Sequence, residues 1–462
     1  MKKTLLAGLI GAAPLLTLAA EAQPGMQEMQ QRLEAMQREI DSLKTALQQS
    51  VTARQDSDEA LTQQVSATAM KVDKLSEDAQ NGPIAGLSIS GYIDPLYSSN
   101  LGRKSASFVF ANRSQSYNYD TSNLGDVYLD IKKTFGSGPL APYVDITIMP
   151  DRGAGVYSSL DSNGNGNMSI LNSAQAVVPL DEHWQVFAGD IPSWAGYEYA
   201  ASNQTVNITH NLLYDFSEPS NIVGAGASWV QGAWSVKAML GNEAGRSQAS
   251  QVNNAANRTP SLSWRVDNML TNNIDIGWYG YLARGTSGNY TGSTPNFGRV
   301  AYTEVDISNT QLDDISAAQF DYGSAEYSAL NGGRAQWWGF SLLKHHKFET
   351  AALGRMGWTV RYDYLNNSKN GGGNPSIGLS ANGNDPINGF GVDPACYALD
   401  PSGCKGAVRQ DITAALLFYP TDQLQLKLEA RHDISSVRSF ERADGTTSKH
   451  NDVLSAQAVY SF

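Results

Sequence analysis

The sequence predicts an all-β transmembrane antiparallel β-barrel of 14–16 strands, possibly 18, preceded by an α-helical coiled coil. Two observations predict the barrel. From Ile84 onward apolar residues alternate with polar ones, which indicates strands with one apolar and one polar face. The connections between these strands are alternately short and long. Short turns at one rim and long polar loops at the other are typical of a membrane barrel and distinguish it from a soluble sandwich.

Composition agrees with a barrel and excludes other classes. The 462 residues are 41% hydrophobic and the mean hydropathy is -0.34, which is too polar for a bundle of membrane helices. A barrel needs only one apolar face per strand, so this average does not argue against it. The net charge of -12 disfavours nucleic-acid binding, which requires a basic face.

Residues 1–22 have the pattern of a secretory signal peptide. Lys2 and Lys3 supply the positive start, an apolar run follows from Leu5 to Leu18, and Ala20-Glu21-Ala22 is a small-x-small cleavage site. The mature chain is therefore expected to begin at Gln23, and the protein to be exported from the cytoplasm.

Residues 23–82 are predicted to form a periplasmic coiled-coil oligomerisation segment. Apolar residues recur there at spacings of three and four, as in a heptad seam. An isolated helix cannot bury such a seam, so we expect a homo-oligomer, although a single amphipathic helix lying on the barrel is the alternative. Asn81-Gly82-Pro83 ends the helix. The first run of the seam consists of Met26, Met29, Leu33, Met36, Ile40, Leu43 and Leu47.

Residues 84–462 are predicted to form the barrel. The clearest strand runs from Leu424 to Arg431, where leucines alternate with charged residues. The tally is 14 strands, or 16 if residues 298–330 contain a hairpin within the long connection 285–333. Charged side chains on the second face of many strands indicate a wet face, which in a barrel lines the lumen. The lumen-facing candidates are Asp130, Lys132, Asp145, Arg265, Arg361, Asp363, Lys427, Glu429 and Arg431.

The last strand, Leu454 to Phe462, resembles the closing strand of bacterial outer-membrane barrels. The resemblance implies that Phe462 is an assembly signal for the barrel assembly machinery. It also implies a place in the outer membrane, in contact with membrane lipid and lipopolysaccharide, with the stalk in the periplasm. The alternative is an ordinary C-terminal strand of a soluble sandwich.

Residues 184–228 resemble the OmpL-like β-barrel porins. The matching positions lie in a strand end, a Gly-x-Glu segment and an Asn-x-Thr-His segment: Gly189, Gly196, Glu198, Asn207, Thr209 and His210. Together with the stalk, which is similar to that of stalked trimeric porins, the resemblance implies a homotrimer. It further implies that the third long loop, 192–221, folds into the lumen. The candidates for the pore constriction are then Glu198, His210, Asp215, Tyr197 and Tyr214.

The function implied is a water-filled channel for the passive diffusion of small hydrophilic solutes. A ring of carboxylates favours cations, and His210 stands where such porins often have Arg, so we expect a mild cation preference. One alternative leaves the loop on the barrel rim with its charges in bulk water. Another is a structural or adhesin-like barrel without open-channel activity.

No enzymatic activity, cofactor or metal is expected. His210 and His450 lie in outer loops without an accompanying nucleophile motif. The run 161–166 begins like a calcium-binding loop, but Asn172 occupies the position of the bidentate acid. His345-His346 lacks visible acidic or cysteine partners and is interpreted as a solvated rim. Cys396 and Cys404 are a disulfide candidate in an exported protein.

Overall fold

The computed structural model describes residues 84–110, 125, 127–149, 171–219, 221–243, 260–286, 297–372, 389–400 and 403–462, together with Gln37, Glu39, Ile40 and Ser42. The latter four are helical and exposed. The predicted signal peptide and the rest of the predicted coiled coil lie outside the described residues. The chain divides into two compact units, Met1–Ile84 and Ala85–Phe462. The second unit contains every strand described below.

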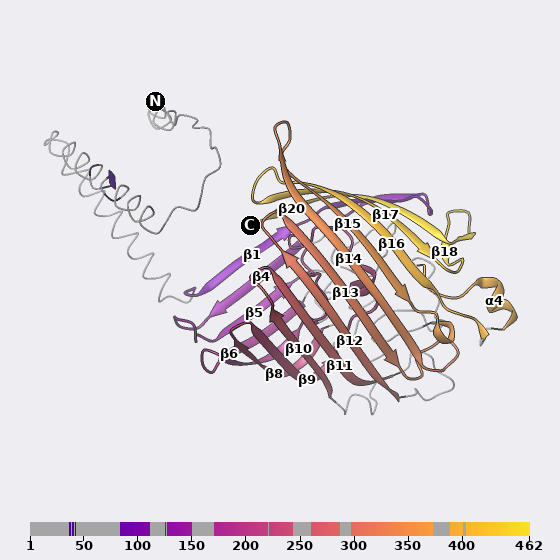
Figure 1. Ribbon diagram of the computed structural model, residues 1–462, viewed down its shortest axis with the longest axis horizontal. Coiled ribbons are helices and arrows are strands. Elements are labelled where there is room, and N and C mark those ends of the chain that lie inside the picture. Colours follow the sequence, from indigo (N-terminus) through magenta and orange to yellow (C-terminus); the bar gives the residue numbers. More distant parts are fainter. Residues whose placement is uncertain are drawn as a thin grey trace, which may run out of the picture. The chain divides into compact units, whose positions relative to one another are not determined.

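The second unit is an antiparallel β-barrel (Figure 1). Its main sheet has 18 strands, of which 16 form a closed ring. The hairpin of β2 and β3 pairs with the Val453–Gln457 part of β20. The strands are β1 (Leu87–Ile93), β2 (Leu96–Asn100), β3 (Ser105–Val109), β4 (Val127–Thr134), β5 (Tyr143–Ile148), β6 (Leu171–Pro179), β7 (Trp184–Ile191), β8 (Ile222–Gln231), β9 (Trp234–Glu243), β10 (Ser261–Met269), β11 (Ile274–Thr286), β12 (Phe297–Thr310), β13 (Asp314–Ala325), β14 (Ala335–Thr350), β15 (Gly354–Asn366), β16 (Val408–Phe418), β17 (Leu424–Ser435), β18 (Phe440–Glu441), β19 (Thr447–Ser448) and β20 (His450–Ser461). Short helices lie in connections: α3 (Leu212–Phe216), η3 (Lys369–Gly371) and α4 (Pro394–Leu399).

The ring closes between the first and last strands. β1 pairs with β4 along its whole length and with the end of β20, where Ile93 is opposite Tyr460. The backbones of Gly91 and Phe462 exchange two hydrogen bonds, of 3.0 and 2.9 Å. A closed sheet leaves no unpaired strand edge, which satisfies the backbone polar groups without water. The final residue is therefore part of the closure.

The segment 298–330 does contain a hairpin, made of β12 and β13, in which Val305 is opposite Phe320. The upper tally of 16 strands is thus confirmed and the tally of 14 is wrong. Residues 285–333 are not one long loop, because they hold these two strands. The alternation over Val300-Ala301-Tyr302 was weaker evidence than that of other strands, since alanine marks neither face.

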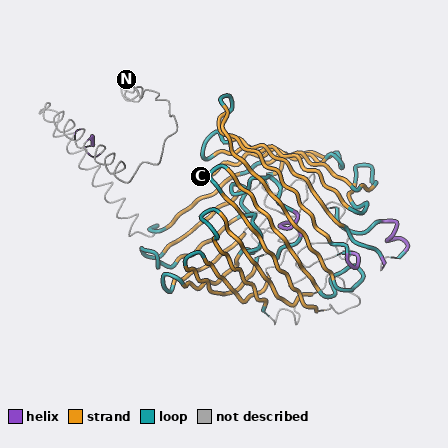
Figure 2. The backbone as a smooth tube through the Cα atoms, viewed as in Figure 1, coloured by secondary structure: helices purple, strands orange, loops and turns teal. Residues whose placement is uncertain are grey.

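The wall is apolar outside and polar inside, as the alternation predicted. In β17, Leu426 and Leu428 are 38% and 49% exposed, whereas Lys427, Glu429 and Arg431 between and after them are at most 5% exposed. A soluble β-protein has the opposite arrangement. The path of the strands around the barrel is visible in Figure 2. In the described part of the chain, no helix has the length and apolarity needed to cross a bilayer.

The two rims differ in their connections. At one rim, turns of three or four residues join β6 to β7, β10 to β11, β12 to β13 and β14 to β15. At the other rim, connections of more than ten residues join β5 to β6, β7 to β8, β15 to β16 and β17 to β20. The loop 192–221, which connects β7 to β8, therefore starts and ends at the long-loop rim.

Candidate functional site

The loop 192–221 lies along the inner side of the wall. It begins at Trp194, whose carbonyl oxygen accepts a hydrogen bond of 2.7 Å from Arg265 on β10. It reaches β1 and β20 at Ser202, whose backbone N–H donates to the Tyr92 hydroxyl at 3.0 Å and whose hydroxyl accepts from Gln457 at 3.4 Å. It returns by Glu218, which accepts from Gln319 on β13 at 2.8 Å. The loop therefore contacts inward side chains on β10, β13, β20 and β1.

Lys427 and Glu429 of β17 bind the middle of the loop. Glu429 accepts hydrogen bonds from the backbone N–H groups of Ile208 at 2.6 Å and Thr209 at 3.0 Å, and from the side chains of Thr209 at 2.7 Å and Asn207 at 3.2 Å. The ammonium group of Lys427 donates to the carbonyl oxygens of Ser202, Thr205 and Asn207 at 2.7–3.1 Å. One acid and one base, two positions apart on the same strand, thus hold both backbone donors and backbone acceptors of the loop.

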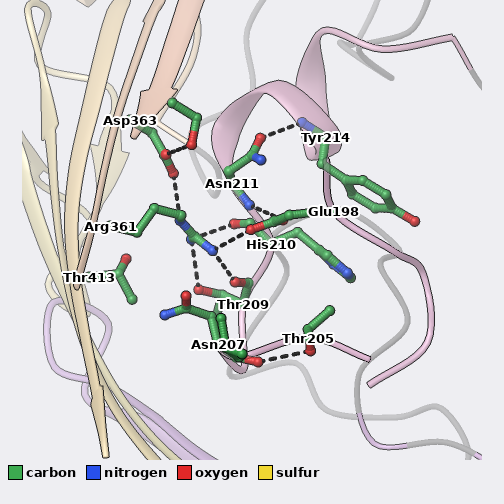
Figure 3. A network of polar contacts seen from close by, with 12 residues as sticks. Glu198, Thr205, Asn207, Thr209, His210, Asn211, Tyr214, Arg361, Asp363 and Thr413 are labelled. Carbon is green, nitrogen blue, oxygen red and sulfur yellow. Dashed lines mark hydrogen bonds and ion pairs between the residues drawn. The ribbon is translucent and has the colours of Figure 1, made fainter. Parts of the chain in front are cut away.

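Two buried arginines bind the next turn of the loop, and Figure 3 shows the contacts of one of them, Arg361. Arg361 of β15 donates to the carbonyl oxygens of Thr209 at 2.6 Å and His210 at 2.8 Å, and pairs with Glu198 at 3.0 Å. Arg431 donates to the carbonyl oxygen of His210 at 2.9 Å. Charge-assisted hydrogen bonds of this kind are roughly twice as strong as neutral ones.

The same arginines belong to an ion-pair layer on β15–β17. Arg361 pairs with Asp363, Arg431 pairs with Asp411 and Asp433, and Arg409 pairs with Asp433, all at 2.7–3.0 Å and all with fully buried side chains. Buried charges are tolerated only when they are paired, because desolvating an ion is costly. Three arginines and three aspartates satisfy this requirement, and the loop seals the layer from water.

Helix α3 carries the last part of the loop. The Asn211 side chain caps its start by accepting from the backbone of Leu213 at 2.8 Å and Tyr214 at 2.7 Å. Phe216 at its end contacts Phe390, with ring centroids 4.8 Å apart. Phe390 comes from the connection between β15 and β16, so a second long connection also reaches into the barrel.

The predicted constriction residues are placed between the loop and the wall. The Tyr197 hydroxyl is 2.7 Å from the Ser341 hydroxyl, and the Glu198 side chain is 6% exposed against Arg361. The imidazole of His210 stacks on Tyr214 with centroids 4.1 Å apart, and Asp215 is 1% exposed. Each of the five residues is therefore buried or makes a packing or polar contact, and Tyr214 is half-buried. Their role at a constriction stays a prediction.

The lumen-facing candidates divide into two groups. Arg265, Arg361, Asp363, Lys427, Glu429 and Arg431 are buried beneath the loop. Asp130 and Lys132 on β4 and Asp145 on β5 are half-buried. The ammonium group of Lys132 lies 4.1 Å from the centroid of the Tyr143 ring. The first group holds the loop, and the second lies on wall that the loop does not cover.

Several residues of the site were not among the sequence candidates. Arg409 and Asp411 of β16 and Asp433 of β17 complete the ion-pair layer. Alternation in Val408–Phe418 places Arg409, Asp411 and Thr413 on one face and would have nominated them. That they pair with residues of neighbouring strands depends on register, which alternation alone does not give.

The remaining candidates are the histidine pair His345-His346, the run 161–166 and the two cysteines. The buried His345 contacts the Thr359 hydroxyl at 2.9 Å, while His346 is near Asp314 at 3.4 Å. Within the described residues, no three His, Cys, Asp or Glu side chains are grouped so as to hold a metal ion. The run 161–166 lies outside them. Cys396 and Cys404 form a disulfide that joins the ends of the α4 region.

Comparison with known proteins identifies the family. A family model described as "Protein of unknown function (DUF3138)" matches residues 48–462. The chain belongs to this family. The resemblance to OmpL-like porins is not confirmed by this match. No curated protein matches the chain.

Solved structures with a similar fold include outer-membrane barrels. The trimer form of OmpT of Vibrio cholerae has 10% identity and a TM-score of 0.49, covering 81% of this chain and 99% of that chain. An anion-selective porin from Comamonas acidovorans has 8% identity, a TM-score of 0.49 and the same coverage. The outer-membrane channel DcaP of Acinetobacter baumannii has 11% identity and a TM-score of 0.46, covering 81% and 97%.

Proposed function

We propose that this DUF3138 protein is an outer-membrane porin, a water-filled channel for the passive diffusion of small hydrophilic solutes. The observation that carries the proposal is the division of the inner wall. Most inward side chains of β13–β17, next to the loop 192–221, are buried, whereas Asp130, Lys132, Asp145, Gln175 and Lys237 on β4, β5, β6 and β9 are half-buried. The proposed water path runs between the loop and these strands.

The polar groups on this path support a mild cation preference. On the strands left uncovered, Asp130 and Asp145 accompany Lys132. Further along the wall, Asp267 and Asp275 are half-buried beside Lys237. With Arg265, which pairs with Asp267 at 2.5 Å, these groups comprise four acids and three bases, and the remaining negative charge attracts cations. Both lysines also lie over aromatic rings, Tyr143 at 4.1 Å and Trp194 at 5.4 Å, which restrains them at the wall.

The outer membrane and a homotrimer belong to the same proposal. An outward apolar wall needs a lipid environment, and the heptad seam in residues 23–82 needs partner helices, which copies of the same chain supply. Cross-linking of the native protein in membranes, followed by electrophoresis, tests the trimer. A monomer band without cross-linked dimer and trimer bands would contradict the proposed trimer.

The test of channel function is a planar-bilayer recording of the refolded full-length protein. We expect stable conductance steps, and a reversal potential in a KCl gradient of the sign that indicates cation preference. Anion preference would refute the selectivity. The absence of any conductance from folded protein would refute the channel and favour the structural or adhesin-like barrel.

A further inference from the structure

A cluster of basic side chains lies at the long-loop end of β11–β14. It consists of Arg284, Arg299 and Arg334, with Lys369 of η3 beside them. Arg299 is 79% exposed and Arg334 48% exposed, and Arg284 is also exposed. A net charge of -12 for the whole chain makes a local excess of positive charge a feature that needs a reason. We call these four residues the basic cluster.

Strand register places Arg284 and Arg299 on the outer surface of the barrel, and Glu326 joins Arg334 to Arg299. On β11, Arg284 shares its face with Leu282 and Trp278, both 47% exposed, while Tyr281 on the other face is 3% exposed. On β12, the neighbour of Arg299, Val300, is 8% exposed and faces inward. The arginines therefore point away from the water path proposed above.

Within the described residues, Glu326 is the carboxylate that pairs with the basic cluster, and it does not balance all four basic groups. Arg284 and Arg299 are directly opposite one another across β11 and β12, an arrangement that is unfavourable for like charges. Glu326 accepts from both Arg299 at 3.1 Å and Arg334 at 2.9 Å and so holds two guanidinium groups together. The connection 287–296 contains no charged residue. One carboxylate beside four basic groups leaves an excess that a bound anion would neutralise.

The neighbours of the basic cluster indicate the depth at which it lies. Tyr322 and Trp338, outward-facing and directly opposite one another on β13 and β14, are 41% and 38% exposed. Gln336 links these aromatic rings to the basic cluster, because it donates to the Tyr322 hydroxyl at 3.0 Å and accepts from Lys369. Amphipathic aromatic rings gather at the membrane–water interface. Arg284 is two residues beyond the apolar Leu282, about 7 Å along the strand, which corresponds to the headgroup level.

We propose that the basic cluster binds the phosphate groups of an anionic lipid in the outer leaflet. Guanidinium groups recognise phosphate by paired hydrogen bonds, and clustered basic residues beside a membrane bind anionic headgroups. The apolar and aromatic surface of β11–β14 below them contacts the acyl chains. This inference goes beyond channel function, but it rests on the membrane orientation proposed above.

The test uses the full-length protein in a neutral detergent and diphosphorylated lipid A as the probe, with binding followed by native mass spectrometry. The variant R284Q/R299Q/R334Q removes three charges from the cluster. The control R103Q/K344Q/R355Q removes three charges from other ion-paired sites, and retained β-sheet circular dichroism shows that both variants fold. Each basic residue near an anionic lipid surface contributes roughly fivefold, so we expect binding to weaken on the order of a hundredfold in the first variant only.

Four results would overturn the inference. Unchanged binding by the cluster variant would show that these arginines are not the site. An equal loss in the control would reduce the effect to general electrostatic attraction. If dephosphorylated lipid A bound as tightly as the probe, the phosphate groups would not be recognised. If inorganic phosphate alone bound as well at the same concentration, the lipid would not be needed. The measurement needs no conductance, so a barrel that binds the probe but conducts no ions leaves this inference standing.

Discussion

At the scale of single residues, Glu429 holds the loop by accepting four hydrogen bonds from residues 207–209. In Glu429→Gln, the amide keeps one acceptor oxygen and turns its NH2 group toward donors. Hydrogen bonds to charged groups contribute roughly 1.5–3 kcal/mol each, so we expect a loss of about 2–4 kcal/mol in the free energy of unfolding. Denaturant titration of the detergent-solubilised barrel measures this loss.

A matched variant separates the loop contact from loss of charge. Glu349 is an exposed acid at the short-turn rim, and Glu349→Gln should change the free energy of unfolding by less than about 0.5 kcal/mol. Amide hydrogen exchange should rise at Ile208 and Thr209 in the Glu429 variant alone. Equal stability of the two variants would show that Glu429 does not hold the loop.

Glu326 provides a pH-dependent contact outside the strands. The backbone N–H of Arg299, together with the guanidinium groups of Arg299 and Arg334, lowers the pKa of Glu326 from 4.5 to about 2. Because the pKa falls on folding, the stabilisation is fully present above about pH 4.5 and is lost as the pH falls toward 2. We expect the protection of the Arg299 amide from hydrogen exchange to fall over this range.

The variant Glu326→Gln is the control for that measurement. Its Arg299 amide should be less protected than that of the wild type at pH 5, and the two proteins should converge as the pH approaches 2. A difference that stays constant over the whole range would show that ionisation of Glu326 does not stabilise this contact.

At the scale of elements, alternation predicted strands well wherever leucine or an aromatic residue marked the apolar face, as in β17. It was weakest in β12 and β13, where Ala301 and Ala317 fit either face and two strands were merged into one possible loop. The inward placement of the loop 192–221 was expected only by resemblance. The attachment of the loop to Glu429 could not be predicted, because Glu429 and Asn207 are 222 positions apart in the sequence and meet only in the closed barrel.

The attachment of the loop to β15 can be measured as a coupling. Arg361→Met leaves Glu198 and Asp363 buried without their shared cation, and breaking a buried pair in this way costs roughly 3–5 kcal/mol. Glu198→Gln removes one of the two acids. In the double variant the loss should be smaller than the sum of the single losses, by about 0.5–3 kcal/mol.

Denaturant titration of the four proteins in one detergent completes this cycle. Arg355→Met is its control, because Arg355 pairs with Asp422 in exposed positions and should cost at most about 1 kcal/mol. Strict additivity of Arg361→Met and Glu198→Gln would mean that the ion pair does not fasten the loop to the wall.

At the scale of the whole molecule, the asymmetric lumen makes selectivity a property of the wall that the loop leaves uncovered. Sequence reasoning treated all inward charges alike, since alternation reports the face of a residue and not what covers it. Arg361 and Asp130 have the same pattern in the sequence, yet one is fully buried and the other half-buried. Only the first group should affect stability strongly, and only the second should act on passing ions.

This division predicts which acids set the ion preference. The double variant D130N/D145N removes two negative charges from the proposed water path and leaves the contacts between the loop 192–221 and the wall intact. We expect the reversal potential in a KCl gradient to move toward the anion-selective sign, and the shift to shrink in high salt, where screening is stronger. Asp452→Asn is the control, since Asp452 is 52% exposed beside His432 on the outward face and should leave the reversal potential unchanged. An unchanged reversal potential in D130N/D145N would place the conducting path away from β4 and β5.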